Sequence, residues 1–288
     1  MSVGEETWTT LKVLNWTKEY LAEKGIENSR LEAEWLLASA LNLDRIGLYL
    51  NFDKPLSEKE LATYRNMVSR RAKREPLQYI METQEFYGLE FNVSPAVLIP
   101  RHDTEILVSE TLKRAAPESR ILDIGTGSGC IAITLASNLP EAEIYGVDLS
   151  SNAILTAKQN AKQHDVHVTF LEGSLFEPIK ELSFDIIVSN PPYIPSEEIN
   201  SLQPEVKDYE PQNALDGGVD GLEFYRLIIK EAHQHMEKDG WLLFETGINQ
   251  ADSVVAMLEK NNFKKIEIIK DLSGIERVVC GCLIQCGE

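Results

Sequence analysis

The spacing of hydrophobic residues changes near residue 78 and divides the chain. Before that point, apolar residues recur at intervals of three and four, as over residues 8–21 and 31–41, which predicts amphipathic helices. Ser57 and Glu60 have the spacing of a capping box, so a third helix is expected from there to about Arg74, and Pro76 should end it. We therefore expect a small helical domain over residues 1–76.

The next stretch has a strand pattern. Two short β-favouring runs flank Gly88, within residues 85–93, and predict a β-hairpin. This hairpin would form a linker over residues 77–100. Beyond it, an amphipathic helix is expected to about residue 116, with Asp103 or Thr104 as its cap.

From residue 120 onward, short apolar runs alternate with helical patterns. Such alternation predicts an α/β fold built on a doubly wound sheet, here over residues 101–288. Strands are expected at residues 121–124, 143–147, 166–171, 184–188, 241–246, 266–269 and 277–284, and helices up to about 137 and at 153–163, 221–237 and 251–261.

Charge is unevenly distributed along the chain. The net charge is −18, and residues 1–80 hold 12 Lys and Arg against 12 Asp and Glu, so the later part carries the whole acidic excess. An acidic surface repels a phosphate backbone, which disfavours binding to duplex DNA. The basic run at residues 70–74 is interpreted as a solvated last helical turn. The absence of a long apolar run or a signal-peptide pattern indicates a cytoplasmic protein.

Cysteine and histidine spacing does not favour a metal site. Cys280, Cys282 and Cys286 match no common zinc pattern, and alternation in a C-terminal strand accounts for them better. His233 and His235 are two residues apart on a predicted helix, where they would not face each other. No metal is expected.

The run Asn190-Pro191-Pro192-Tyr193 follows a predicted buried strand. Proline cannot continue the ladder, so these residues should lie at the carboxyl edge of the sheet, where α/β proteins bind ligands. The Asn190 side-chain oxygen and the Pro191 carbonyl could each accept one N–H of a planar NH2 group, and Tyr193 could stack on it. The tetrapeptide resembles the signature of enzymes that methylate such nitrogens.

A glycine-rich turn follows the first strand of the sheet. Its pattern over residues 125–129 is G-x-G-x-G; a dinucleotide fingerprint would need a third glycine where Cys130 stands. Glycines there let the backbone approach a ligand, and the following helix N-terminus favours an anion such as a carboxylate. Asp148 ends the next strand, where an acid can bind ribose hydroxyls or cap the next helix.

Together these motifs resemble class I S-adenosylmethionine-dependent methyltransferases, and specifically the peptide chain release factor glutamine N5-methyltransferase family. The resemblance is carried by residues 75–80, 99–105, 121–129, 190–193, 210–211, 214–215, 217–222, 250–251 and 271–277. It implies a Rossmann-like, mostly parallel sheet with an antiparallel C-terminal strand, and a monomer. The chain departs from the family pattern at His102, where proline is usual, and at Ser174-Leu175, where an acid and an aromatic residue are usual.

The resemblance implies methylation of the glutamine side-chain nitrogen in the Gly-Gly-Gln motif of class I release factors. The cofactor would be S-adenosyl-L-methionine. Cofactor-binding residues would be Gly125, Thr126, Gly127, Ser128, Gly129, Asp148, Leu175 and Asn190; Asn190, Pro191, Pro192 and Tyr193 would bind substrate, with Asn190, Pro191 and Tyr193 catalytic. Phe176 could compensate for the aliphatic Leu175 in adenine stacking.

Some alternatives and roles stay open from the sequence. Arg101, Asp103 and Glu105 could fix a loop over the cofactor through ion pairs and helix capping. An adenine-N6 nucleic-acid methyltransferase would suit the tetrapeptide equally well, but it would need a recognition region and a basic groove. A ribosomal-protein glutamine methyltransferase is a closer alternative, and the run at residues 101–105 favours the release-factor branch.

Overall fold

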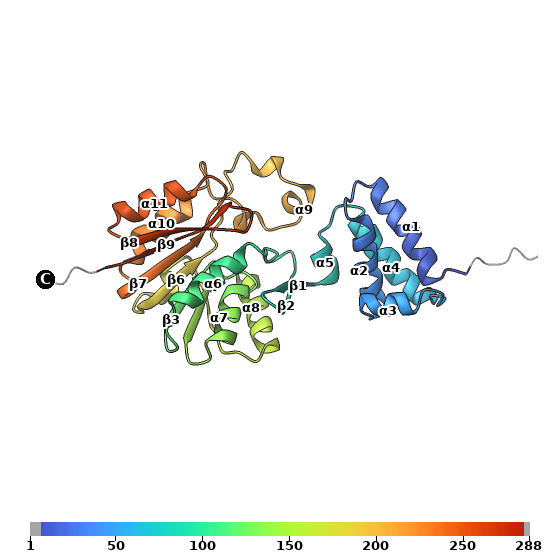
Figure 1. Cartoon of the computed structure of the whole chain (residues 1–288), viewed down its shortest axis with the longest axis horizontal. Coiled ribbons are helices and arrows are strands. Elements are labelled where there is room, and N and C mark those ends of the chain that lie inside the picture. Colours follow the sequence, from blue (N-terminus) through green and yellow to red (C-terminus); the bar gives the residue numbers. More distant parts are fainter. Residues whose placement is uncertain (1–6, 285–288) are drawn as a thin grey trace, which may run out of the picture. The chain divides into compact units, whose positions relative to one another are not determined.

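The computed structural model describes residues 7–284, and the chain divides into two compact units (Figure 1). One unit contains the residues up to Glu82 together with Pro204–Tyr209, and the other contains Thr83–Gln203 and the residues from Glu210 onward. Within the described range, none of the helices combines the length and apolar character needed to cross a membrane.

The first unit is a helical bundle. It contains α1 (Thr10–Glu23), α2 (Ser29–Leu41), α3 (Arg45–Leu50), α4 (Glu58–Arg71), α5 (Leu77–Met81) and the short α9 (Pro204–Lys207). Leucines from α1, α2 and α3 pack with Tyr64 of α4 in a core of its own. The predicted capping box is confirmed, with Ser57 and Glu60 bonded reciprocally. Helices α3 and α5 were not predicted, because five or six residues are too few to show a helical period.

The basic run at the end of α4 differs from its interpretation as a solvated turn. Arg71 is only 6% exposed. Its guanidinium donates to Glu32 at 2.5 Å and to Glu205 at 3.0 Å. Arg74 also pairs with Glu205, and Arg70 pairs with Glu75. Arg71 and Arg74 therefore hold Pro204–Tyr209 in the helical unit, a role that local sequence could not reveal.

The second unit opens with a hairpin of β1 (Thr83–Phe86) and β2 (Leu89–Asn92), as expected. α5 precedes it, in the stretch that the sequence analysis assigned to the linker. Phe86 and Phe91 are fully buried in the same core as the helices on one face of the sheet. Asn92 also donates from its backbone and side chain to the Asn160 side-chain oxygen, which fixes the hairpin to α8 (Ser151–Gln163).

A seven-stranded sheet forms the centre of this unit, in the order β5-β4-β3-β6-β7-β9-β8. The strands are β3 (Arg120–Ile124), β4 (Glu143–Asp148), β5 (Thr169–Glu172), β6 (Phe184–Ser189), β7 (Met236–Glu245), β8 (Lys264–Lys270) and β9 (Glu276–Cys282). β3 to β7 are parallel, and β9 pairs antiparallel with both β7 and β8. The predicted fold class, including its antiparallel C-terminal strand, is confirmed.

Helices cover both faces of the sheet (Figure 1). α6 (Thr104–Arg114), α7 (Cys130–Asn138) and α8 pack on one face, while α10 (Glu223–Ala232) and α11 (Ala251–Lys260) pack on the other. Successive strand residues point to opposite faces: Ile121 and Ile186 enter one core, and Leu122 and Ile187 enter the other. Burial on both faces explains why these strands read as continuous apolar runs.

Three predicted boundaries were wrong. α10 ends at Ala232 rather than near 237, and β7 begins at Met236 rather than 241, because Phe184 of β6 pairs with Met236. The hydrophobic pattern does not show this extension of β7, because residues 237–239 are polar and exposed. β5 starts at Thr169, three residues later than expected.

Candidate functional site

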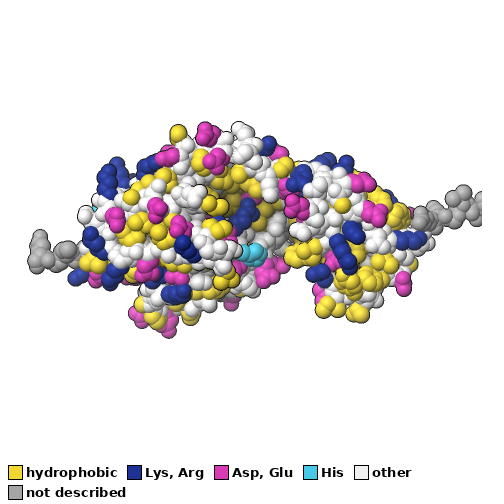
Figure 2. Space-filling model, turned by 45° about the horizontal axis from the view of Figure 1, so that its top comes forward, with side chains coloured by type: hydrophobic (Ala, Val, Ile, Leu, Met, Phe, Trp, Pro, Cys, Tyr) yellow, Lys and Arg dark blue, Asp and Glu magenta, His cyan; other side chains and the backbone are white. Residues whose placement is uncertain are grey.

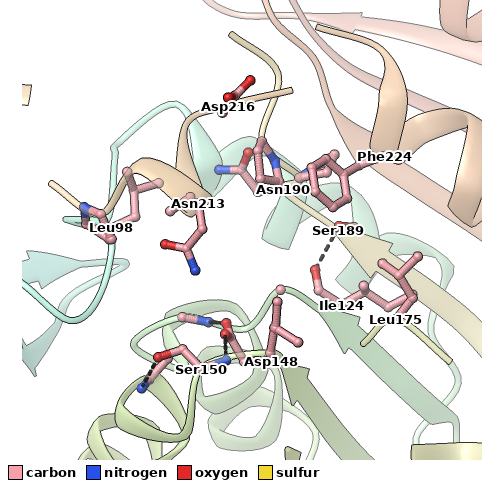
Figure 3. Close-up of a pocket in the computed structure, with 18 of the residues that line it drawn as sticks. Leu98, Ile124, Asp148, Ser150, Leu175, Ser189, Asn190, Asn213, Asp216 and Phe224 are labelled. Atoms are coloured by element: carbon pink, nitrogen blue, oxygen red, sulfur yellow. Dashed lines mark hydrogen bonds between the residues drawn. The ribbon is translucent and has the colours of Figure 1, made fainter. Parts of the chain in front are cut away.

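The parallel strands end at one edge of the sheet, and a pocket of about 500 Å³ lies there. The ends of β3, β4 and β6 contribute Gly125, Asp148 and Asn190 to its lining, and Figure 3 labels Asp148 and Asn190. Figure 2 shows a hollow with hydrophobic side chains on the surface of this unit. Residues from three separate predicted motifs therefore share one cavity.

The glycine turn exposes its backbone to the pocket. Gly125 and Gly127 have φ values of +75° and +55°, in the region that favours glycine. A Cβ atom on Gly125 would meet no atom within 4 Å, so a side chain there would extend into open space on the pocket side. Gly129 has another role: a Cβ there would come within 3.1 Å of Ala157 in α8, so glycine allows α7 and α8 to pack closely.

Three predicted cofactor residues in this turn, Thr126, Ser128 and Gly129, do not line the pocket. Thr126 is 3% exposed and donates its hydroxyl proton to Asp123 at 2.6 Å. Ser128 is 2% exposed. Burial raises the pKa of the Asp123 carboxyl to about 7. The hydrogen bond between Thr126 and Asp123 therefore supports the turn from its buried side, whereas Gly125 and Gly127 form its open surface.

Asp148 joins the end of β4 to the glycine turn. One carboxylate oxygen accepts the Gly127 N–H at 2.9 Å, and the other accepts the Ser150 N–H at 2.9 Å (Figure 3). Burial raises the pKa of this carboxyl, against those two hydrogen bonds. Each carboxylate oxygen can accept a further hydrogen bond, so Asp148 can still bind two hydroxyl groups of a ligand. Ser150 caps α8 instead, by accepting the Ala153 N–H.

The end of β6 brings Asn190, Pro191 and Pro192 to the pocket. Ser189, immediately before them, donates its hydroxyl proton to the Ile124 carbonyl at 2.7 Å and ties β6 to β3 (Figure 3). The Asn190 side-chain nitrogen donates to the Thr104 hydroxyl at 3.2 Å. This hydrogen bond connects the Asn190 side chain to the first residue of α6.

Tyr193 lies behind the pocket and is not among its lining residues. Its hydroxyl donates to Glu245 at 3.5 Å, and its carbonyl accepts from the Gln250 side chain at 2.8 Å. Gly221 and Gly247 allow this packing, since a Cβ on either would come within 3.0 Å of Tyr193 atoms. The structure does not bring the ring to the cavity where sequence analysis expected it to stack on the substrate.

Leu175 lines the pocket, in an unusual backbone conformation with φ of +49°. Phe176 does not compensate for it, contrary to the expectation. Its ring is 1% exposed and stacks on His235, with centroids 4.8 Å apart. The left-handed backbone at Leu175 separates the two side chains, and Phe176 enters the core instead.

The run at residues 101–105 forms ion pairs. Arg101 pairs with the buried Glu210 at 2.5 Å, and Asp103 pairs with Arg277 at 2.8 Å. Glu105 accepts the Tyr87 N–H at 3.0 Å and lies 3.3 Å from His102. Asp103 stands at the N-cap position of α6 but makes no capping hydrogen bond. The loop is therefore fixed by charge pairs rather than by a side-chain cap.

Further lining residues were not predicted as site residues. They are contributed mainly by loops after the hairpin and after β6, and include Leu98, Ser150, Asn213, Asp216 and Phe224 (Figure 3). The glycines of residues 217–221 were the available signal, because Gly218 and Gly221 have positive φ and shape the second loop. Without a periodic pattern, these loops gave no direct indication of which side chains face the cavity.

The chain offers no metal centre in residues 7–284, where no cluster of three or more His, Cys, Asp or Glu side chains could hold an ion. Cys280 and Cys282 lie in β9 and are both buried, in agreement with the strand interpretation. Cys286 lies outside the described residues.

The lining suits a ligand with both an apolar and a polar end. Val147, Leu175, Phe224 and Ile228 supply apolar surface, and Asp148 lies beside it with acceptors for hydroxyl groups. The open backbone of the glycine turn and the N-terminus of α7 favour a carboxylate. S-adenosylmethionine, with its adenine, ribose and methionyl carboxylate, fits this set of groups.

Family models match both units. Residues 12–81 match the PrmC N-terminal domain, and residues 102–203 match the methyltransferase small domain. Among solved structures, a methyltransferase from Pyrococcus furiosus has a TM-score of 0.53 at 17% identity, covering 69% of this chain and 91% of that one. A Thermus thermophilus 16S rRNA N2 G1207 methyltransferase, solved with AdoMet and guanosine, has a TM-score of 0.52 at 18% identity, covering 69% and 49%. Both establish the fold.

Similarity to curated proteins is much higher. The release factor glutamine methyltransferase of Geobacter sulfurreducens is 57% identical over 98% of this chain and 99% of its own. That of Fusobacterium nucleatum is 42% identical over 93% of this chain and 77% of its own. Similarity at this level over nearly the full length places this chain in the release factor glutamine methyltransferase family.

Proposed function

We propose that this protein transfers a methyl group from S-adenosylmethionine to the side-chain amide nitrogen (N5) of the glutamine in the Gly-Gly-Gln motif of class I release factors. The observation that carries the proposal is the shared pocket of Asn190, Pro191 and Asp148. It combines acceptors for an NH2 group with acceptors for a ribose. The products would be N5-methylglutamine and S-adenosylhomocysteine.

An amide nitrogen is a weak nucleophile, because its lone pair is delocalised into the carbonyl. Asn190 Oδ1 and the Pro191 carbonyl would each accept one N–H of the substrate amide. Two acceptors at fixed positions would orient the nitrogen and favour localisation of its lone pair. The proline ring restricts the backbone at this point, so little reorganisation would be needed.

The bound cofactor supplies an electrophilic methyl group. Gly125 and Gly127 would hold its methionyl part along their exposed backbone, and Asp148 would bind its ribose hydroxyls. Leu175 would pack on the adenine as an aliphatic surface. Catalysis would then come chiefly from positioning, since the substrate nitrogen and the methyl group would be fixed in one cavity.

The protein partner would be a class I release factor, and we expect the enzyme to act as a monomer in the cytoplasm, where release factors function. Two observations disfavour a nucleic-acid substrate. The acidic excess lies entirely in residues 81–288, which repels a phosphate backbone. Between Tyr193 and α10, the described chain forms pocket-lining loops and the short α9, with no inserted domain that could serve as a recognition region.

The substrate class can be tested with tritium-labelled S-adenosylmethionine. Release factor, ribosomal protein and duplex DNA would each be incubated separately with the enzyme, with Asn190→Ala as the inactive control. We expect label on release factor alone. Label on ribosomal protein or DNA, with none on release factor, would overturn the proposed substrate.

A further inference from the structure

A glutamine side chain joins three loops at the pocket edge of the sheet. Gln250 stands at the N-cap position of α11, but its side chain makes no capping hydrogen bond. Instead, its Nε2 donates to the Tyr193 carbonyl at 2.8 Å and to the Gly221 carbonyl at 3.3 Å. Its Oε1 accepts the Gly247 N–H at 3.1 Å. One amide therefore links the loop after β6, the loop before α10 and the loop after β7.

The three partners fix the orientation of this amide. Two of them are carbonyls, which can only accept a hydrogen bond, and the third is an N–H, which can only donate. A reversed amide would place its oxygen against both carbonyls and its NH2 group against the N–H. Two glycines leave room for the side chain, because a Cβ atom would come within 2.6 Å of Nε2 at Gly221 and within 2.8 Å of Oε1 at Gly247. The Nε2 atom of Gln250 is therefore directed at Tyr193 and Gly221.

The two carbonyls that Gln250 binds come just after residues that line the pocket. Residues 191–192 precede Tyr193, and residues 218–219 come shortly before Gly221; Gln250 itself is not among the lining residues. In the loop of residues 190–193, here called the catalytic loop, both prolines fix their φ angles, so the remaining freedom of the loop lies chiefly at its exit. Gln250 anchors that exit at Tyr193 from outside the cavity.

Backbone hydrogen bonds hold the same two loops together. The Ile194 N–H donates to the Leu215 carbonyl at 3.0 Å, and the Gly217 N–H donates to the Ile194 carbonyl at 2.8 Å. The Ser196 N–H donates to the Gly218 carbonyl at 2.9 Å. The catalytic loop and the loop before α10 therefore share one hydrogen-bonded network, and these N–H groups report whether the two loops stay together.

We propose that Gln250 is a positioning residue for methyl transfer, which holds the catalytic loop so that the Pro191 carbonyl faces the substrate nitrogen. The inference rests on the proposed function, in which that carbonyl accepts an N–H of the substrate amide. Loss of the anchor would let this acceptor move without removing any group from the cavity. Asp148 and the glycine turn follow other strands, so cofactor binding does not depend on Gln250.

Two variants of Gln250 separate its hydrogen bonds from its bulk. Gln250→Met keeps the length of the side chain and removes all three hydrogen bonds. Gln250→Glu keeps the shape and the acceptor for the Gly247 N–H, but it replaces the donor to the Tyr193 carbonyl by an oxygen. Thermal unfolding would establish that each variant folds, and either variant alone tests the inference.

Gln163→Met is the matched control. The Gln163 side chain of α8 also bridges two elements, because it accepts the Asn92 side-chain N–H at 2.7 Å and donates to the Glu90 carbonyl at 2.9 Å. These hydrogen bonds go to the hairpin rather than to the catalytic loop, and Gln163 does not line the pocket. This variant therefore measures the general cost of removing a bridging glutamine.

We expect both Gln250 variants to lower kcat about tenfold or more, less than the ~100- to 1000-fold typical for loss of a direct polar contact. The KM for release factor and the Kd for S-adenosylmethionine should change little, because no group that would contact either ligand is removed. Gln163→Met should keep the wild-type kcat. A role confined to stability would instead lower the melting temperature and leave the kcat of the folded enzyme unchanged.

Hydrogen exchange measured by mass spectrometry gives a readout that does not depend on activity. In Gln250→Met, peptides that contain residues 194–196 and 217–221 should exchange their N–H groups faster than in wild type, because the two loops separate more often. Peptides from β3 should exchange at the wild-type rate in the same variant.

The inference would be overturned if the folded Gln250 variants kept the wild-type kcat, or if Gln163→Met lowered kcat equally. If wild-type enzyme did not methylate release factor, the proposed function would fail, while hydrogen exchange would still test the anchor. Unchanged exchange of both loops in Gln250→Met would refute the inference itself.

Discussion

The Asp148 carboxylate accepts the Gly127 N–H at 2.9 Å and thereby joins the acid at the end of β4 to the glycine turn after β3. The sequence predicts two separate contributions to cofactor binding from these features. In the structure, the carboxylate holds the turn in place and still has capacity to accept hydrogen bonds from a ligand. Substitution of Asp148 should therefore affect both the turn and the ligand.

Asp148→Ala should weaken binding of S-adenosylmethionine strongly. Loss of two charge-assisted hydrogen bonds, of about 1.5–3 kcal/mol each, sets the scale. Asp148→Asn keeps one acceptor oxygen and should bind with intermediate affinity. Calorimetric titration with the cofactor measures both, and unchanged affinity in Asp148→Ala would contradict the ribose-binding role.

Asn190→Ala should lower kcat by ~100- to 1000-fold, because it removes a preorganised acceptor. Asn190→Asp keeps the shape but brings a negative charge beside the substrate amide, and should also be strongly impaired. Cofactor affinity should change little in either variant. Single-turnover methylation of release factor at saturating cofactor is the measurement. Near-normal turnover by Asn190→Ala would refute the orientation role.

Tyr193→Phe should be much milder than Tyr193→Ala. The phenylalanine variant loses only the 3.5 Å hydrogen bond to Glu245, whereas alanine leaves a cavity in the support of the catalytic loop. Tyr193→Ala should also lower the melting temperature, because the ring packs against the core. Equal turnover losses in the same single-turnover assay would show that the hydroxyl carries the effect.

Sequence reasoning found the residues that follow buried strands. Gly125, Asp148 and Asn190 each come directly after an apolar run, and parallel strands bring their carboxyl ends to one edge. The same reasoning could not determine which way a side chain faces once the strand has ended. Tyr193 was expected in the cavity, yet Gly221 and Gly247, far along the chain, make room for it behind the loop.

Long-range charge pairs also could not be predicted from the sequence. The position of Arg71 at a helix end predicts a solvated side chain. Its partner Glu205 lies 134 residues away, so the local sequence does not indicate the pairing. The partner of Arg101 lies 109 residues away. Neither pairing has a periodic or local signal, so only the fold identifies these arginines as structural.

The buried Asp123 should make stability depend on pH. Its pKa is raised to about 7 in the folded state, so its contribution to stability is fully present below its ordinary pKa and is lost as pH rises through about 7. The loss has an upper limit of about 1.4 kcal/mol for each unit of pKa shift. Asp123→Asn should therefore become more stable relative to wild type at pH 8 than at pH 5.

Chemical denaturation at both pH values measures this effect. Asp252→Asn, at an exposed carboxyl of α11, provides the control, and its difference from wild type should barely change between pH 5 and pH 8. A constant difference between Asp123→Asn and wild type across this range would contradict the assignment.

Arg101 and Glu210 should be energetically coupled. Arg101→Ala would leave the buried Glu210 carboxylate without its charged partner, at a cost of about 1–3 kcal/mol. Because Leu98 and Pro211 line the pocket beside this pair, cofactor affinity should also fall. In a double-mutant cycle with Glu210→Gln, the double variant should lose less than the sum of the single losses. Additive losses would mean that the pair does not fix the loop.

The most direct test of the whole account is to locate the methyl group. Purified release factor would be incubated with the enzyme and S-adenosylmethionine, digested, and analysed by peptide mass spectrometry with fragmentation. We expect the mass of one methyl group on the side chain of the Gly-Gly-Gln glutamine, with no product from Asn190→Ala or from a release factor whose glutamine is replaced by alanine. A methyl group on any other residue, or an unmodified glutamine after incubation with folded enzyme, would contradict the account.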